Sequence, residues 1–209
     1  HVTIAYHRTI RVELAQQLMV DAAWCGASSI QLIPAWVDIN GVDRARNHAV
    51  KLAESVNADY LIMQDADTWV HGPCIPSLLA TINRHRAAAV AASVALRNRG
   101  GCNVTPAHPG ETYLAELAGT GIMMIDMRDV ADVPRPLFLS HSSADGLRNE
   151  CGEDIYFCRK LREHGKLIAV DYTLTTAHAT QDVNVLDPSN AHAKRQLAET
   201  TAKAGTQGQ

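Results

Sequence analysis

Two aspartates separated by one residue stand at the end of an apolar stretch of this chain. Asp65 and Asp67 follow residues 60–64, which read Tyr-Leu-Ile-Met-Gln. In an extended backbone, side chains two residues apart point to the same side, so we expect the two carboxylates to converge where a strand leaves its sheet. Such a pair suits Mg²⁺ or Mn²⁺, which usually take further ligands from water and from a substrate's phosphates. The pair therefore indicates a metal site for a phosphorylated substrate; the alternative is that both residues cap a turn.

A further acid belongs to a helix predicted for residues 152–164. Asp154 shares a helical stripe with the three apolar residues at positions i+3, i+4 and i+7, so a carboxylate lies on the face that should point inward. An acid in that place suits a general base whose pKa is raised by partial burial. The alternative is that Asp154 and Glu153 stabilise the first helical turn, where negative charge favours the helix dipole.

Two cationic side chains lie at the start of another predicted helix. Arg44 and Arg46 lie in the first turns of residues 42–56, with Asn47 beside them. A helix start and two guanidinium groups together form a site for a phosphate or for the edge of a base, although an ordinary solvated helix face remains an alternative. His178 follows the last predicted strand and is one of ten histidines, so by itself it suits a structural role as well as metal binding.

The composition narrows the class of protein. The chain has 209 residues, a formal net charge of −3, 46% hydrophobic residues and 20% charged residues, which fits a globular domain and gives no basic excess for nucleic acid. No apolar run approaches the roughly 20 residues that cross a bilayer. The first residues read as a strand and not as a signal peptide, so we expect a cytoplasmic protein. The five cysteines are scattered without a CxxC spacing, and we expect reduced thiols.

Strands and helices alternate along the chain. This order predicts an α/β fold with a mixed, mostly parallel sheet flanked by helices. We expect strands at residues 2–6, 29–33, 60–65, 87–96, 119–126 and 167–170, and helices at residues 11–24, 42–56, 73–84 and 152–164.

Irregular and polar segments complete the organisation. Residues 97–112 and 140–149 should be loops that cover the site, and one of them should order when ligand binds. We expect one domain over residues 1–180, followed by a polar tail over residues 181–209 that is mobile or weakly docked.

In combination these motifs resemble the GT-A class of nucleotide-sugar glycosyltransferases, of the family 2 type, over residues 2–178. The resemblance depends on five segments in the same order along the chain: Gly41 followed by Ala45-Arg46-Asn47, the DxD-like Asp65-Ala66-Asp67, Gly119-Thr120-Gly121, Gly152-Glu153-Asp154, and His178.

The resemblance implies a Rossmann-like GT-A fold and a hexosyltransferase-type enzyme that uses a UDP- or GDP-sugar with Mn²⁺ or Mg²⁺. It implies metal binding by Asp67 and His178, with Asp65 near the metal or the ribose. The residues that it implies for binding the nucleotide sugar are Tyr6, Arg8, Arg46, Asn47, Asp65 and Gly121. Residues 6–9 lack the proline common in this class, which leaves the base open.

The resemblance leaves the course of the reaction open. In an inverting enzyme, Asp154 would deprotonate an acceptor hydroxyl and Glu153 would orient the acceptor, and we favour this course slightly. In a retaining enzyme the same carboxylates would only position the substrates. A nucleotidyltransferase would also suit a carboxylate pair of this kind, as would a non-catalytic module that binds nucleotide sugar or carbohydrate. The acceptor can be a glycan, a protein, a lipid-linked sugar or a small molecule.

Overall fold

The structure is a computed structural model that describes residues 11–96, 101–143, 145, 149–179 and 185–186. The strand expected at residues 2–6 lies outside the described residues. Tyr6 and Arg8 lie outside them as well.

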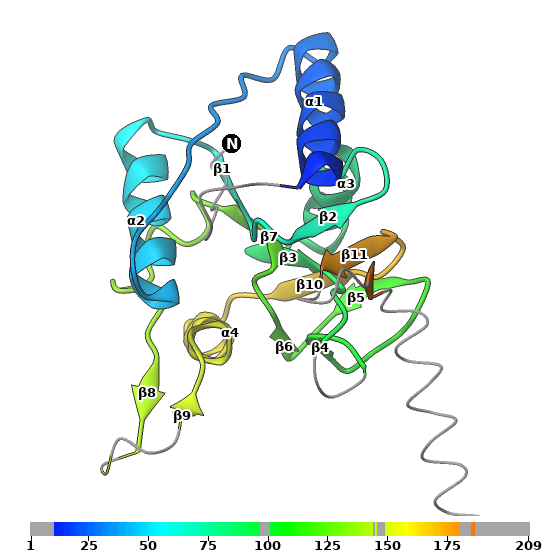
Figure 1. The fold of residues 1–209 in the computed structure, drawn as a ribbon. Coiled ribbons are helices and arrows are strands. Elements are labelled where there is room, and N and C mark those ends of the chain that lie inside the picture. The colour runs from blue at the N-terminus through cyan, green and yellow to red at the C-terminus, as the bar shows by residue number, and fades with distance from the viewer. Residues whose placement is uncertain (1–10, 97–100, 144, 146–148, 180–184, 187–209) are drawn as a thin grey trace, which may run out of the picture.

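A five-stranded sheet forms the centre of the molecule (Figure 1). Its order is β1 (Tyr60–Gln64), β7 (Ile122–Asp126), β3 (Ala89–Ala92), β10 (Ile168–Asp171) and β5 (Thr112–Leu114). Both β1 and β3 run antiparallel to β7, while β10 runs parallel to β3 and antiparallel to β5. Three of the five strands therefore share one direction, which confirms the predicted mixed sheet, and β3 with β10 is the parallel pair among its four pairs of neighbouring strands.

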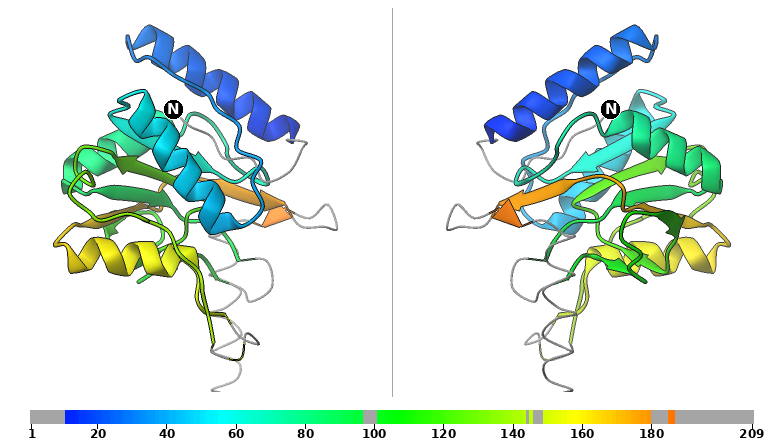
Figure 2. Two further views of the ribbon diagram at one scale, coloured as in Figure 1. Left: turned by 90° about the vertical axis from the view of Figure 1, so that its left-hand side faces the viewer. Right: turned by 90° about the vertical axis from the view of Figure 1, so that its right-hand side faces the viewer.

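Helices cover both faces of this sheet, because successive strand residues point to opposite sides. Leu61 and Met63 belong to one buried cluster, together with side chains of α2 (Val42–Ser55) and α4 (Glu153–Glu163). Ile62 and Met124 belong to a second cluster with side chains of α3 (Ile75–His85). Figure 2 shows α4 along the lower side of the sheet, with α3 and α1 (Val12–Ala27) above it.

Three small sheets surround the central one. They are β2 (Thr68–Val70) with β11 (Thr176–Ala179) and β12 (Val185–Leu186), β4 (Val104–Thr105) with β6 (Leu117–Ala118), and β8 (His141–Ser142) with β9 (Asn149–Cys151). The register of β11 on β2 sets His178 opposite Thr68. The late histidine therefore stands next to the turn that carries Asp67.

The structure corrects several details of the expected elements. The strand predicted at residues 29–33 is wrong, because no strand is assigned there. The expected loop at residues 97–112 contains β4, and the one at residues 140–149 contains β8 and the first residue of β9, its partner strand. Residues 185–186 of the expected tail form β12, which pairs with β11, and the rest of the tail lies outside the described residues. No helix within the described ranges is both long and apolar enough to span a membrane.

Candidate active site

The carboxylate pair lies in a turn directly after β1. The backbone N–H of Asp65 donates to the carbonyl of Gly121 over 2.8 Å. The hydroxyl oxygen of Thr68 lies 2.9 Å from the same carbonyl oxygen and 3.0 Å from that of Asp65, so its single hydrogen is shared between the two acceptors. These bonds satisfy the backbone groups that a strand leaves unpaired where it ends. They fix Asp65 beside Gly121, at the entrance to β7.

Arg46 joins three parts of the chain at this point. Its side chain is only 3% exposed, and it donates from Nη2 to Asp65 Oδ1 over 3.2 Å and from Nε to Glu153 Oε1 over 3.3 Å. Its third donor, Nη1, reaches the carbonyl of Thr120 over 3.2 Å. Burial raises the pKa of the Asp65 carboxyl, and the adjacent guanidinium opposes that rise. The arginine of α2 is therefore an interior charge that organises the site and not part of a solvated face.

Asp67 and His178 face each other on neighbouring strands. Nε2 of His178 lies 3.8 Å from Oδ1 of Asp67, which exceeds hydrogen-bonding distance. Nδ1 of His178 donates to the carbonyl of Ala95 over 2.7 Å, so the lone pair of the neutral ring lies at Nε2. Metal-binding histidines are commonly oriented in this way by a hydrogen bond from the other ring nitrogen. A carboxylate and an imidazole so placed fit a divalent cation.

Asp67 and His178 would supply only part of the coordination shell of a divalent cation, and the neighbouring side chains that the structure describes do not supply the rest. Within the described ranges, no group of three or more His, Cys, Asp or Glu residues is close enough to hold an ion. Asp65, the second carboxylate that the sequence suggests as a metal ligand, bonds to Arg46. Mg²⁺ and Mn²⁺ accept this arrangement, because they keep several waters and take the remaining ligands from substrate phosphates.

Asp154 lies at the start of α4, where Gly152 is the N-cap residue. Its Oδ1 accepts a hydrogen bond from the backbone N–H of Ile155 over 2.7 Å. A Cβ at Gly152 would lie 2.8 Å from that oxygen, so the lack of a side chain there leaves room for the carboxylate. The predicted apolar stripe of the helix is confirmed, because Phe157, Cys158 and Leu161 are fully buried.

A cavity of about 170 Å³ collects these groups. The residues predicted from sequence that line it are Arg46, Asp65, Gly121, Glu153, Asp154 and His178. Asp67 adjoins it through His178. Pockets for drug-sized ligands span roughly 300–1,000 Å³, so the cavity accommodates only part of a nucleotide sugar. The elements that form it come from widely separated parts of the chain, and they place four charged side chains and the imidazole of His178 in one small space.

Asn47 lies elsewhere. Its amide nitrogen donates to the carbonyls of Asp43 and Phe138 over 2.8 and 2.7 Å, and its oxygen accepts from the N–H groups of Leu137 and Phe138. All the hydrogen-bonding capacity of the side chain is used in tying α2 to this segment. Asn47 does not line the cavity.

Asn103 is a lining residue that the sequence did not single out. Its Oδ1 accepts from the N–H of Val94 over 2.7 Å, and this bond fixes the orientation of the amide. Nδ2 then lies beside Gly119, only 2.5 Å from the position that a Cβ would occupy there. An isolated Asn in an irregular segment gives no periodic signal, so spacing could not identify it.

Two solved structures share this arrangement of elements. A197 from STIV superposes with a TM-score of 0.66 at 20% sequence identity, covering 90% of this chain and 89% of A197. GalNAc-T7, whose crystal structure contains UDP, GalNAc and Mn²⁺, superposes with a TM-score of 0.52 at 15% identity, covering 85% of this chain but only 43% of GalNAc-T7. A comparison with curated protein sequences gave no match.

The fold is therefore that of the GT-A glycosyltransferases, as the resemblance in sequence implied. The sequence profile described as glycosyl transferase family 2 matches residues 33–144, more than half of the chain. The protein belongs to glycosyl transferase family 2, and it is a glycosyltransferase with a nucleotide-sugar donor.

Proposed function

We propose that this protein transfers a hexose from a nucleoside diphosphate sugar to an acceptor hydroxyl, with Mn²⁺ or Mg²⁺ and with inversion at the anomeric carbon. The observation that carries the proposal is that Asp154 and His178 line the same cavity as the Arg46–Asp65 ion pair. This arrangement supplies a base, a metal ligand and an anchored polar surface within one space, as sugar transfer from a diphosphate requires.

The donor's diphosphate lies beside Asp67 and His178 in this proposal. A divalent cation held there would supply Lewis-acid stabilisation of the negative charge that develops on the leaving diphosphate. Asp65 would lie near the ribose or the metal, with its position maintained by Arg46. Gly121 leaves space above Asp65, since a Cβ at this position would lie 3.7 Å from Oδ2.

The acceptor is activated by Asp154, which takes the proton of the attacking hydroxyl. Glu153 acts indirectly: its carboxylate holds the Nε of Arg46 and is 15% exposed, so we assign it as a positioning residue. This differs from the role beside the acceptor that its place next to Asp154 suggests. Arg46 in turn orients Asp65, so α4 and the end of β1 are linked through one guanidinium.

Thermal unfolding with nucleotides tests the donor and the metal. UDP is the first choice because it occupies GalNAc-T7, which has the same fold; GDP, CDP and dTDP follow, each with and without Mn²⁺. A ligand at a hundred times its Kd stabilises the native state by about 2.7 kcal/mol. We expect a shift for one nucleotide that needs Mn²⁺ and is lost in Asp67→Ala.

Asp59→Ala is the matched control, because Asp59 is 70% exposed and lies outside this cavity. It should retain the full shift. A shift that survives in Asp67→Ala, or that does not need the metal, would contradict the metal-bridged donor site.

The role of Asp154 needs a separate measurement. We expect Asp154→Asn to bind nucleotide and metal as the wild type does, and to lose at least 100-fold in transfer rate, since removing a general base typically costs a factor of about 100–10,000. NMR of the product's anomeric proton identifies the stereochemical course. A product with the donor's configuration would reject inversion and the role of Asp154 as base.

A further inference from the structure

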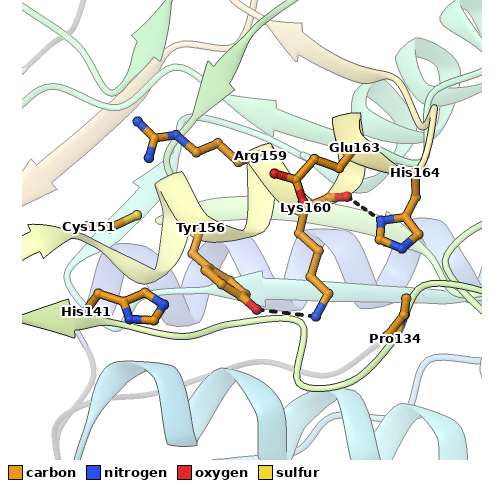
Figure 3. Close-up of a pocket in the computed structure, with 8 residues that line it drawn as sticks. All are labelled: Pro134, His141, Cys151, Tyr156, Arg159, Lys160, Glu163 and His164. Atoms are coloured by element: carbon orange, nitrogen blue, oxygen red, sulfur yellow. Dashed lines mark hydrogen bonds between the residues drawn. The ribbon is translucent and has the colours of Figure 1, made fainter.

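A second cavity, of about 580 Å³, lies along α4 and shares no lining residue with the cavity above Asp65 (Figure 3). Its walls come from α4, from the paired strands β8 and β9, and from Pro134. Its volume falls within the range of ordinary small-molecule sites, roughly 300–1,000 Å³. It is therefore a second place where a ligand can bind, with its own set of side chains.

One wall of this cavity is aromatic. The rings of Tyr156 and His141 lie 5.6 Å apart at an angle of 48°. Figure 3 shows Tyr156 projecting from α4 toward the segment that carries His141. A partly exposed aromatic ring offers a flat apolar surface with a polar group at its edge. The C–H face of a sugar ring packs against such a surface while its hydroxyls reach polar neighbours.

The cavity also carries positive charge from Lys160 and Arg159, which Figure 3 shows on opposite sides of α4. Nζ of Lys160 donates to the carbonyl of Pro136 over 2.7 Å and lies 5.3 Å from the centre of the Tyr156 ring, so the ammonium group is held in place. Arg159 is exposed and forms no ion pair with any residue that the structure describes. Glu163 is the acid of the cavity, so the lining contains two cations and one carboxylate. An available guanidinium suits bidentate binding of phosphate or carboxylate.

We propose that this α4 cavity binds an anionic sugar, meaning a sugar unit that carries a phosphate or a carboxylate, as the part of the acceptor away from the reacting hydroxyl. Arg159 lies five residues after Asp154, roughly 7.5 Å farther along the helix axis and turned by about 140° around it, so the two side chains point to different sides of α4. An acceptor that reaches both positions therefore has to extend around the helix over more than one sugar unit. That the ligand is an acceptor depends on the proposed function; that the cavity binds an anionic sugar does not.

Isothermal titration calorimetry of the full chain, without nucleotide and at low ionic strength, tests the proposal. Glucose 6-phosphate and glucuronic acid are the anionic probes, glucose is the neutral probe, and inorganic phosphate is the anion alone. We expect the two anionic sugars to bind at least tenfold more tightly than either glucose or phosphate. Equal affinity for glucose would overturn the role of charge, and equal affinity for phosphate would overturn the role of the sugar ring.

Matched variants locate the site. Arg159→Gln should weaken binding of glucose 6-phosphate at least fivefold. Arg162→Gln, at an exposed position on the same helix but outside the cavity, should change it less than twofold. Bound sugar should also slow alkylation of Cys151, which lines the cavity. Equal loss of affinity in both variants, or no binding by the wild type, would overturn the proposal.

The test of the α4 cavity can fail or succeed independently of the test of the proposed function. If UDP with Mn²⁺ stabilises the protein but no anionic sugar binds, the inference about the α4 cavity fails and the proposed function stands. If an anionic sugar binds with the expected effect of Arg159→Gln but no nucleotide stabilises the protein, the proposed function fails and the cavity's assignment as an anionic sugar site stands.

Discussion

Arg46 donates to Asp65 over 3.2 Å, and this bond divides the two carboxylates after β1 between different partners. Asp65 is turned toward the guanidinium, while Asp67 faces His178. The spacing of the two aspartates suggests a pair of carboxylates on one side of an extended strand. In the folded protein Asp65 is paired with Arg46, and Ala66 and Asp67 form a turn instead of continuing the strand.

Removing this arginine should destabilise the fold. We expect Arg46→Met to lower the free energy of unfolding by about 2–3 kcal/mol, because two partly buried carboxylates and a carbonyl lose a charged donor. Urea unfolding measures the change. Arg44→Met is the control, since Arg44 lies two residues earlier on the same helix, is exposed, and should change stability by no more than about 0.5 kcal/mol. Similar losses in both variants would show that the Arg46 bonds contribute little.

Gly152 should matter for chemistry more than for stability. In Gly152→Ala, the new Cβ would meet Asp154 Oδ1 at 2.8 Å, and the flexible carboxylate can move away at little cost. The backbone at this position has a φ of −69°, which alanine adopts without strain. We expect stability to change by less than about 1 kcal/mol while the transfer rate falls at least tenfold, because the base is displaced.

Gly26→Ala is the control for that substitution. Nothing lies within 4 Å of the position of its Cβ, so neither rate nor stability should fall. Wild-type activity in Gly152→Ala would mean that the observed position of Asp154 is not the catalytic one.

Local patterns predicted the helices because one face of each must be buried. The apolar stripe of α4 consists of Phe157, Cys158 and Leu161, which are fully buried. The helical spacing of these residues was sufficient to predict the helix. The buried position of Arg46 could not be found in this way. Its partner Glu153 lies 107 residues away in the chain, and helical spacing carries no information on such a contact.

The strand predicted at residues 29–33 is wrong for a similar reason, because local sequence carries no information on tertiary contacts. Its apolar residues suit a strand, but a strand also needs a neighbour that supplies hydrogen bonds, and that neighbour is set by the tertiary fold. Leu32 instead packs as a partly buried side chain against the cluster beneath α3. The acids and His178 were predictable because their residue types and order resemble a family, whereas Asn103 belongs to no such motif.

The cysteines should differ sharply in reactivity. Cys102 and Cys151 are partly exposed, while Cys25, Cys74 and Cys158 are buried. Burial raises the pKa of the Cys158 thiol to about 12, so almost none of it is thiolate at pH 8. We expect iodoacetamide to modify two cysteines in the native protein at pH 8 and all five in denaturant. Peptide mass spectrometry identifies them, and rapid modification of Cys158 in the folded chain would contradict its burial.

Asn103 should bind the nucleotide sugar through the nitrogen of its side-chain amide. Oδ1 is committed to the N–H of Val94, so Nδ2 is the group available beside Gly119 at the cavity. Asn103→Asp keeps the acceptor for Val94 and replaces the donor with an oxygen. We expect the free energy of unfolding to stay within about 1 kcal/mol and the KM for the nucleotide sugar to rise at least tenfold, because a charged oxygen replaces a hydrogen-bond donor.

A second variant separates binding from structure. Asn103→Ala also removes the acceptor for Val94, whose N–H is then left unpaired, and we expect it to lose about 1–3 kcal/mol of stability. If both variants lose the same stability, the side chain acts only by holding the backbone. If Asn103→Asp keeps both its stability and the wild-type KM, Nδ2 does not contact the donor, and the polar surface beside Gly119 must face something other than the nucleotide sugar.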